Sequence, residues 1–383
     1  MSNSPNGTNP LVVVAMSGGV DSSLAAFLLK QKGYPVVGMS MKLWDFREVG
    51  GEAHPDGRCC SLEGLDDARA VCQKMGVPHY VVDMRDDFRK DVISNFVEEY
   101  AEGRTPNPCV ICNTRIKWDS LWKKAQSVGA SLIATGHYAR IEYDPQLKRH
   151  LLLKGIDSTR DQSYALWGLS QEDLGRTVFP LGELTKRQVR TLAREYGLKV
   201  AEKEESQEIC FVTDDDYRRF IKEWHASAEQ VSRVKGQGKE IRPGPILNLK
   251  GEKIGEHQGI PFYTIGQRKG LKIAVGRPLY VVRIDAERNA IYVGEDHDLF
   301  QSSFAATRPN WIAFDKLDRE IDCEIKIRYQ HTPQKGRIYP LTEDQVMVRL
   351  NHPERAITPG QSVVFYQGEV VLGGGVIDKM VNG

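Results

Sequence analysis

Residues 11–23 read LVVVAMSGGVDSS, and this stretch decides the fold. Residues 11–16 form a continuous apolar run, which is typical of a buried strand in a parallel sheet. A helix is expected directly afterwards, over residues 21–31. Between them, Gly18 and Gly19 allow a tight turn that a ligand can approach closely. The N–H groups of the turn and of the first helical turn then face one point, which predicts a pyrophosphate site.

Two other interpretations of this loop are weaker. It is not a Walker loop, because no Gly-Lys-Thr follows the glycines. It could be a plain turn in which Ser and Asp cap a helix. The complete string Ser-Gly-Gly-x-Asp-Ser between a strand and a helix favours the phosphate site, with the hydroxyls of Ser17, Ser22 and Ser23 as further donors.

The first half of the chain alternates strands with helices. Further strands are expected over residues 36–41, 79–82 and 132–135, and further helices over 62–75, 86–101 and 118–128. This alternation predicts an α/β domain with an open, mostly parallel sheet. Such sheets bind ligands at the carboxyl ends of their strands.

The second half has a different composition. After an expected helix over 214–224, residues 233–283 hold nine Gly and four Pro, which excludes long helices. Short alternating runs at 323–329, 345–350 and 362–366 indicate antiparallel strands of a small barrel. We therefore expect three domains: residues 1–212, a small mixed central domain over 213–302, and a β-barrel over 303–383.

Composition excludes several classes of protein. The 383 residues are 40% hydrophobic and 27% charged, which is ordinary for a soluble globular chain. No apolar run approaches the roughly 20 residues of a membrane helix, and residues 1–10 lack the features of a secretory signal. Seven cysteines are too few for a disulfide scaffold. A reducing, cytoplasmic location is expected.

The cysteines offer several chemistries. Cys109 and Cys112 form a C-x-x-C that could be half of a zinc site, a redox pair, or reactive thiols at the nucleotide site. No second ligand pair follows at a suitable distance, which disfavours zinc. A helix is expected to start near Asn113, and thiols just before a helix have a lowered pKa, to which Arg115 and Lys117 would add.

The other cysteines carry weaker signals. Cys210 lies between two apolar residues, and its local sequence alone favours a buried core position. Cys59 and Cys60 lie in a loop rich in Gly and Asp and could be reactive, with no assigned role. Cys72 and Cys323 fall on apolar faces and are expected to be structural.

Several motifs occur in one order along the chain: Ser17-Gly18-Gly19-Val20-Asp21-Ser22, Gly103-Arg104-Thr105-Pro106-Asn107-Pro108, Thr135-Gly136-His137-Tyr138, Asp161-Gln162-Ser163-Tyr164, Gly255-Glu256-His257-Gln258-Gly259, Thr264-Ile265-Gly266-Gln267-Arg268-Lys269-Gly270 and Thr358-Pro359-Gly360-Gln361. From about residue 11 to the end, the chain resembles the tRNA-specific 2-thiouridylases, within the pyrophosphatase-loop ATPases. The resemblance implies an adenine-nucleotide-hydrolase-like catalytic domain, a central tRNA-binding domain and a C-terminal barrel. It also implies replacement of O2 of the wobble uridine (position 34) by sulfur, with conversion of ATP to AMP and pyrophosphate.

The resemblance assigns the nucleotide site. ATP would contact Ala15, Met16, Ser17, Gly18, Gly19, Val20, Asp21, Ser22, Met41 and Gly136. Asp21 would help to hold Mg²⁺ on the phosphates, while Met41 and Gly136 would line the adenine pocket.

The resemblance also assigns the sulfur chemistry and the RNA contacts. Cys210 would receive sulfur as a persulfide from a donor protein, and Cys112 would form a disulfide with Cys210 as the product leaves. Asn107, Pro108 and Cys109 would face the target base. Further tRNA contacts would come from His137, Arg160, Asp161, Gln162, Arg328, Tyr329 and Gln361.

The chain departs from the family at one position. Many members have Asp, a possible general acid or base, where this chain has Cys109. Cys109, Cys112 and Cys210 could instead hold a [4Fe–4S] cluster with one iron open for sulfide. The persulfide route is preferred because it needs no further cofactor. Two other hypotheses are an adenylating enzyme for a small molecule, and a non-catalytic iron–sulfur or redox tRNA-binding protein; the intact Ser-Gly-Gly-Val-Asp-Ser loop disfavours the latter.

A tRNA surface must be local, because the net charge is only +1. Residues 233–283 carry eleven Lys or Arg against three Glu, a surplus of eight, and the stretch 266–270 is the densest part. Residues 320–356 have six basic and six acidic residues, so the barrel shows no basic excess. Tyr138, Tyr263 and Tyr329 are candidate platforms for unstacked bases.

Overall fold

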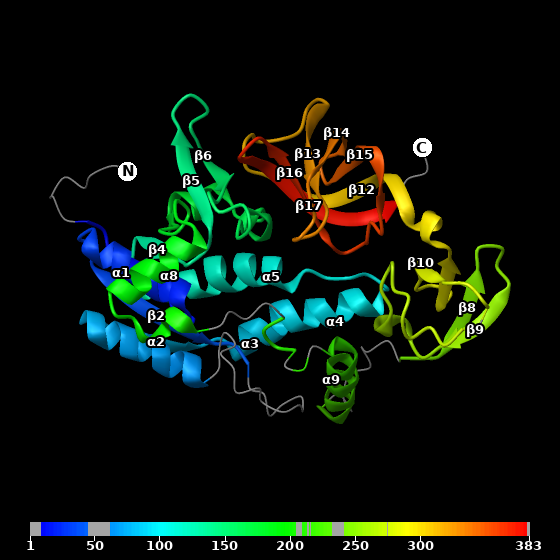
Figure 1. The fold of residues 1–383 in the computed structure, drawn as a ribbon, viewed down its shortest axis with the longest axis horizontal. Helices are drawn as coiled ribbons and strands as arrows, with labels where there is room; N and C mark the ends of the chain where they lie inside the picture. Colours follow the sequence, from blue (N-terminus) through cyan, green and yellow to red (C-terminus); the bar gives the residue numbers. More distant parts are fainter. Residues whose placement is uncertain are drawn as a thin grey trace.

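The protein is described here from a computed structural model, which covers residues 9–44, 62–203, 209–212, 214, 216–231, 241–273 and 275–380. Cys59 and Cys60 lie outside these ranges. Figure 1 shows three parts: a sheet covered by helices at the left, a barrel at the upper right and a small sheet at the lower right.

The first part is built on a five-stranded sheet. Its strands are β1 (Val12–Ala15), β2 (Val36–Lys42), β3 (His79–Asp83), β4 (Leu132–Ala134) and β7 (Thr177–Val178), in the order β3-β2-β1-β4-β7. Every neighbouring pair is parallel, which confirms the predicted sheet. The chain leaves β1 for β2 on one side and returns to β4 on the other. The carboxyl end of β1 is therefore the point where such sheets bind ligands.

Helices cover both faces of this sheet. Val12 and Val14 pack with α1 (Val20–Gln31), α2 (Leu62–Met75) and α8 (Lys186–Glu195). Val13 and Ala15 face a larger core that includes the helices on the opposite side. These are the continuous α3 (Arg85–Phe88), η1 (Arg89–Ile93) and α4 (Ser94–Ala101), and the continuous α5 (Pro108–Ile111), η2 (Cys112–Leu121) and α6 (Trp122–Ser127).

The continuous helix formed by α5, η2 and α6 contains Cys109 and Cys112 and is called the cysteine helix below. It starts earlier than predicted. We expected helical structure near Asn113, but the helix begins at Pro108 with Asn107 as its N-cap residue. Proline suits the first helical position because its fixed φ fits the helix and its missing N–H is not needed there. Cys109 and Cys112 therefore lie within the first turns of the helix and not before it.

The central part is a small mixed sheet, as predicted. Its strands are β8 (Gly244–Asn248), β9 (Lys253–His257), β10 (Tyr280–Asp285) and β11 (Ala290–Gly294), in the order β10-β11-β8-β9. β8 and β11 are parallel, and the other two pairs are antiparallel. The helix α9 (Tyr217–Val231) precedes this sheet and lies beneath α4 in Figure 1.

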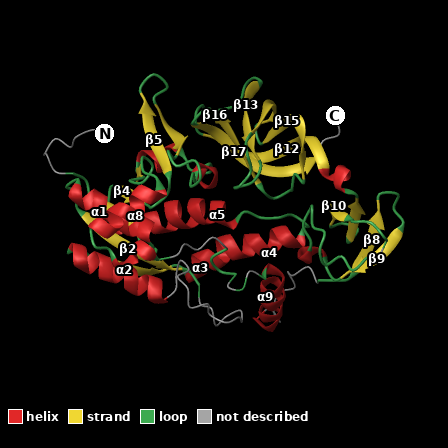
Figure 2. Ribbon diagram, in the orientation of Figure 1, coloured by secondary structure: helices red, strands yellow, loops and turns green. Residues whose placement is uncertain are grey.

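The C-terminal part is the predicted antiparallel barrel. It comprises β12 (Phe300–Trp311), β13 (Ile321–Lys326), β14 (Gln334–Thr342), β15 (Gln345–Arg355), β16 (Ser362–Gln367) and β17 (Val370–Met380). β12 pairs with both β15 and β17, and this closes the barrel. Figure 2 shows the barrel strands as one curved group beside the helical part.

A hairpin from the first half of the chain joins the barrel. β5 (Ala139–Asp144) and β6 (Arg149–Lys154) pair with each other, and β6 meets β17 at Leu153 and Val370. Short helices connect the remaining elements: η3 (Ser163–Leu166), α7 (Gln171–Gly175), η4 (Lys199–Glu202), η5 (Ile260–Phe262) and η6 (Asp296–Leu299). Within the described ranges, no helix is both long and apolar enough to span a bilayer.

Candidate active site

The loop after β1 has the geometry of a phosphate cradle. Gly18 has a φ of +76°, and Gly19 is the N-cap residue of α1. A Cβ atom at Gly18 would lie 2.1 Å from the carbonyl oxygen of Gly64 in α2. Only glycine fits at position 18, because both the φ angle and the neighbouring helix exclude a side chain.

The serine hydroxyls hold the loop in this shape. Ser22 Oγ accepts a hydrogen bond from the backbone N–H of Ser17 at 3.1 Å. Ser23 Oγ donates to the carbonyl oxygen of Gly19 at 2.8 Å. Because Ser22 and Ser23 are buried, their main contribution is to the loop itself, and a ligand would meet its backbone N–H groups.

Asp21 is bound to a lysine that the sequence patterns did not reveal. Lys186 Nζ, at the start of α8, lies 2.8 Å from each carboxylate oxygen of Asp21. The hydroxyl of Tyr138 also donates to Asp21 Oδ1 at 2.7 Å. Lys186 is buried, so the ion pair fixes both side chains beside the loop. The capping box of Thr185 and Gln188 marks the start of α8, but nothing local indicates a contact across 165 positions.

The other expected nucleotide contacts lie at the same edge of the sheet. A Cβ atom at Gly136, just after β4, would lie 2.7 Å from the backbone of Asp21 and Ser22. Met16 follows β1, and its carbonyl accepts a hydrogen bond from Ser40 Oγ at 2.9 Å. Met41 is near the end of β2 and is buried. The structure thus brings the carboxyl ends of β1, β2 and β4 together around the loop.

The cysteine helix presents one thiol to solvent and one partly inward. Cys109 is exposed, and Cys112 is partly buried. Both lie in the first turns of the helix, where the N-terminal dipole favours a thiolate. Lys117 donates to Asn113 Oδ1 at 2.9 Å, and its Nζ lies 3.5 Å from His137 Nε2. The lysine therefore links the cysteine helix to the turn after β4.

Cys210 and Cys112 pack, both partly buried, against the same hydrophobic core. Cys210 is held by its neighbour Phe211, whose ring contacts those of Phe88 and Phe96. None of Cys109, Cys112 and Cys210 takes part in a disulfide bond in the structure. Among the residues that the structure describes, no three His, Cys, Asp or Glu side chains are grouped so as to hold a metal ion.

The remaining described cysteines are structural, as expected. Cys72 is buried beneath β2, and burial raises the pKa of its thiol to about 11. Burial in the barrel raises the pKa of Cys323 to about 12, with a further contribution from Asp322. Both thiols remain protonated near neutral pH and are therefore poor nucleophiles.

His137 is partly buried and lies against two aromatic rings. Its ring lies 5.9 Å from the rings of Trp118 and Phe179, and its Nδ1 is 2.7 Å from Thr135 Oγ1. Burial, and then the charge of Lys117, hold the pKa of His137 well below its usual value. The imidazole is therefore neutral and forms part of the wall between the loop and the cysteine helix.

Asp161 and Gln162, which are expected to contact tRNA, form hydrogen bonds with other residues of the protein. Asp161 accepts hydrogen bonds from the N–H groups of Gly155 and Ser163, each at 3.1 Å. Gln162 Oε1 accepts from the N–H of Tyr138 at 2.9 Å. Arg160 is only partly exposed in the preceding turn. These side chains shape the turn that leads to η3.

The barrel contributes an exposed aromatic group. Tyr329 is 44% exposed, and its ring lies 6.2 Å from that of Tyr164. The Tyr164 hydroxyl donates to the carbonyl of Ser362 at 2.8 Å, and the adjacent Gln361 donates to the carbonyl of Pro106 at 3.0 Å, which connects this aromatic pair to the residues before the cysteine helix. The neighbouring Arg328 donates to the carbonyl of Arg355 at 3.2 Å. This corner of the barrel therefore lies beside the segment expected to face the target base.

Residues between Arg268 and Leu279, in the central part of the chain that is rich in Lys and Arg, line a recess of about 410 Å³. Its walls include three cationic residues, Arg268, Lys272 and Arg277. Lys272 has a positive φ of +55°, and the nearby Gly270 has a φ of +84°, so the loop is sharply folded. The positive lining suits phosphate groups.

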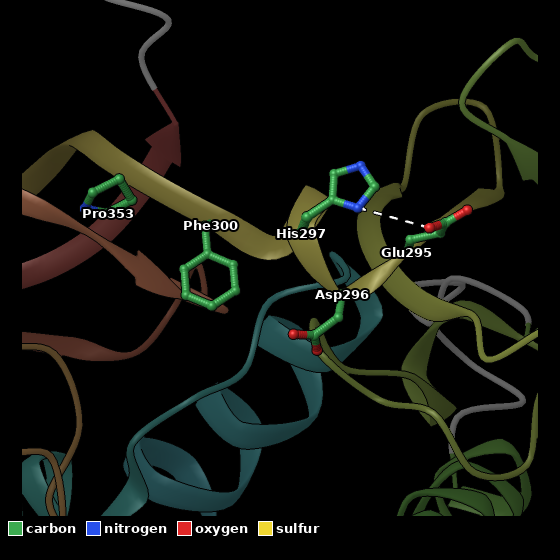
Figure 3. A pocket seen from close by; sticks show the side chains of 5 residues that line it. All are labelled: Glu295, Asp296, His297, Phe300 and Pro353. Carbon is green, nitrogen blue, oxygen red and sulfur yellow. Dashed lines mark ion pairs between the residues drawn. The ribbon is translucent and has the colours of Figure 1, made fainter.

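A second recess, of about 650 Å³, lies where β11 leads through η6 into β12. Figure 3 shows its lining residues, with His297 turned toward Glu295 at 3.8 Å. The carboxylates of Glu295 and Asp296 disfavour a phosphate there. Although this recess is larger than the basic one, it is far along the chain from the loop and the cysteines and contains no thiol.

Known proteins resemble the chain over nearly its whole length. Three family models match it: a "tRNA methyl transferase HUP domain" over residues 10–214, a "tRNA methyl transferase PRC-barrel domain" over 235–295 and an "Aminomethyltransferase beta-barrel domain" over 301–377. Similar curated proteins include the "tRNA-specific 2-thiouridylase MnmA" of Carboxydothermus hydrogenoformans, 48% identical over 369 residues (96% of this chain and 97% of the relative). The protein of the same name from Clostridium botulinum is 45% identical over 375 residues (98% and 99%).

Proposed function

The chain belongs to the tRNA-specific 2-thiouridylase family, and from this premise we propose how it replaces a tRNA uridine oxygen with sulfur at the expense of ATP. The target is the wobble uridine, at position 34. ATP first adenylates O2, and a persulfide on Cys210 then supplies the sulfur, with Cys112 as the second thiol. The supporting observation is the glycine loop at the carboxyl end of β1, with its buried Asp21–Lys186 pair.

The first step gives the uridine a leaving group. The C2 carbonyl of uridine is a poor electrophile, and its oxygen cannot leave as such. Attack of O2 on the α-phosphate of ATP forms an O2–P bond, breaks the bond to the β-phosphate and releases pyrophosphate. Loop N–H groups at the start of α1 would stabilise the developing phosphate charge. The Asp21–Lys186 pair, which has no net charge, would hold the start of α1 and the start of α8 together beside these groups.

The second step transfers sulfur. The terminal sulfur of the Cys210 persulfide attacks C2, and AMP departs with the former O2. The thiolate of Cys112 then attacks Cys210 Sγ, which releases the thiocarbonyl product and leaves a Cys112–Cys210 disulfide. A dithiol reductant restores both thiols before the next persulfide arrives.

Magnesium enters with the nucleotide. Both carboxylate oxygens of Asp21 bind Lys186, and the described residues contain no acidic group clustered with others as a metal site. The ion would therefore be carried mainly by the phosphate oxygens of ATP. Asp21 would act chiefly on Lys186, with its remaining lone pairs open to the ion or its water.

The three cysteines do not fit an iron–sulfur cluster as they are arranged. Cys109 is exposed, whereas Cys112 and Cys210 are partly buried, and they form no metal-holding group among the described residues. We therefore derive no step through a cluster. The persulfide requires a sulfur-donor protein, and we propose a cytoplasmic location, where such carriers meet tRNA.

We propose one role for each of the three domains. Residues 1–212 would carry catalysis, 213–302 would bind tRNA, and 303–383 would form the barrel beside the target nucleotide. The basic recess of the central part, with Arg268, Lys272 and Arg277, supports the second assignment.

The function is tested by direct analysis of the product. The protein is incubated with MgATP, a persulfide donor and a tRNA that has U34, and nuclease digests are examined by mass spectrometry. We expect 2-thiouridine at position 34 and one AMP for each sulfur incorporated. A matched tRNA with C34 serves as the control. Sulfur at another uridine, or none with any tRNA, would contradict the proposal.

The central segment gives a separate prediction. Replacing Arg268 and Lys269 with alanine should weaken tRNA binding and lower the slope of log affinity against log salt, by about 0.7–0.9 for each phosphate group that the variant no longer neutralises. ATP affinity without tRNA should not change. The measurement is a salt titration of tRNA binding.

A charge-matched control is the double alanine variant of Lys123 and Lys124 in α6, where Lys123 is exposed. It removes the same two charges from another surface. Equal loss of tRNA affinity in both double variants would show a nonspecific charge effect and would exclude the central segment as the tRNA site.

A further inference from the structure

The connection between α4 and α5 is the segment that leads directly to the cysteine helix. Figure 1 shows it running along the lower side of the barrel. At its start, Gly103 has a φ of +71°, and a Cβ atom there would lie 2.4 Å from Ile284 Cγ2 in β10. The segment therefore packs closely against the central sheet before it reaches the barrel.

The barrel then binds the backbone of this segment. The N–H of Thr105 donates to the carbonyl of Pro359 at 2.8 Å. Gln361 Nε2 donates to the carbonyls of both Thr105 and Pro106, each at 3.0 Å. Gly360, with a φ of +91°, approaches so closely that a Cβ atom would lie 2.8 Å from Thr105 N and O.

An ion-pair network secures the preceding residue. Arg104 binds Glu99 of α4 at 2.7 Å and Asp378 of β17 at 2.9 Å, and it also donates to the carbonyl of Ile377. These two carboxylates raise the pKa of Arg104 despite the cost of burial. The arginine therefore remains charged and fixes the segment between α4 and the barrel.

The two prolines of this segment explain why the Gln361 side chain is the most important of the contacts that hold it. Pro106 and Pro108 have no backbone N–H, so the segment can form few backbone hydrogen bonds of its own. Buried or half-buried carbonyls need a donor, and the Gln361 amide supplies both hydrogens to two consecutive carbonyls. The next residues are Asn107, which occupies the N-cap position of the helix, and Pro108, which begins it.

We propose that Gln361 is a positioning residue for sulfur transfer: its amide sets the start of the helix that carries Cys109 and Cys112, and its main effect is on rate and not on tRNA affinity. This differs from the RNA contact implied by resemblance, since both amide hydrogens are already donated to Thr105 and Pro106. The inference rests on the proposed function for its kinetic part. It also couples the barrel to the reacting thiols.

The test uses Gln361→Glu, which keeps the shape of the side chain but replaces the donor with a carboxylate facing two carbonyls. At saturating tRNA, the single-turnover rate of thiolation should fall by roughly tenfold or more, since small misplacements of reacting groups are costly. The dissociation constant for tRNA should stay within about twofold. Gln361→Met, which removes the amide without adding a negative charge, should show a smaller loss of rate.

Thiol reactivity provides a readout that general destabilisation would not produce. In Gln361→Glu, the pH profile for alkylation of Cys112 should move to higher pH, because a disturbed helix start stabilises the thiolate less. The control is Gln367→Glu, an exposed position at the end of β16, the strand that begins directly after Gln361, which should leave rate, affinity and alkylation profile unchanged.

Two results would overturn the inference: a large loss of tRNA affinity with an unchanged rate at saturation, or an alkylation profile identical to that of the unmodified protein. Alkylation needs neither ATP nor tRNA. Failure of the unmodified protein to thiolate tRNA would therefore count against the proposed function, while the alkylation profile would still decide the role of Gln361.

Discussion

Replacing Gly18 with valine should abolish tRNA-dependent release of pyrophosphate, a loss on the order of a thousandfold or more. The side chain would have to occupy a position 2.1 Å from the Gly64 carbonyl at a φ of +76°. The loop would open, and its N–H groups would no longer converge on the phosphates. The measurement is pyrophosphate release with saturating tRNA and MgATP.

Gly129→Val is the matched control. Gly129 also has a positive φ, of +83°, but no atom lies within 4 Å of a Cβ placed there. Its backbone strain is comparable, whereas the phosphate loop is untouched, so pyrophosphate release should persist. Wild-type release by Gly18→Val would refute the assignment of the loop.

Asp21→Asn tests the same site without a steric change. The substitution removes the negative charge that holds Lys186 at 2.8 Å, and we expect adenylation to be lost because the buried ammonium group loses its partner. A variant that folds normally and still adenylates tRNA at the wild-type rate would show that this ion pair is not needed.

The second large effect concerns the thiols. Cys112→Ser and Cys210→Ser should each lower thiolation by roughly a thousandfold or more, as expected for the loss of a nucleophile. Adenylation should survive in both variants, because it precedes sulfur transfer. AMP formation and 2-thiouridine are measured in the same reaction.

Mass spectrometry after brief alkylation at about pH 8 should find the buried Cys72 and Cys323 unmodified, since their pKa values are about 11 and about 12.

A substitution at Cys109 distinguishes the persulfide mechanism from a mechanism that uses an iron–sulfur cluster. Cys109→Asp introduces the residue that many family members carry, so thiolation with a persulfide donor should continue in air. In a cluster mechanism, the variant would lose a thiolate ligand, and carboxylate suits iron–sulfur clusters poorly. Iron content and visible absorption of anaerobically prepared protein are measured alongside activity. A brown, iron-containing protein whose Cys109→Asp variant is colourless and inactive would overturn the persulfide route.

The parallel sheet could be predicted from the sequence because its signals are local. The apolar run before Ser17 and the glycines after it specify a strand, a turn and a helix in close succession, and β1 and α1 match this closely. The predicted start of the cysteine helix, near Asn113, was wrong: the helix begins at Pro108, and proline at the first helical position is itself a start signal.

Other features depend on contacts between distant residues. The two-residue strand β7 is defined only by its pairing with β4. The hairpin β5–β6 has one paired position with the barrel strand β17, Leu153 and Val370. Lys186 reaches Asp21 across 165 positions, and Gln361 reaches Thr105 across 256. No periodicity or local motif encodes such contacts, so the sequence alone could not reveal them.

The most direct test of the account follows the oxygen atom that leaves the uridine. An anticodon stem-loop with ¹⁸O at O2 of U34 is thiolated by the protein, and the AMP formed is analysed by mass spectrometry. If ATP adenylates O2, each AMP must carry one ¹⁸O in its phosphate, in equal number to the 2-thiouridine produced. AMP without ¹⁸O, beside thiolated RNA, would contradict adenylation of O2 as the activating step.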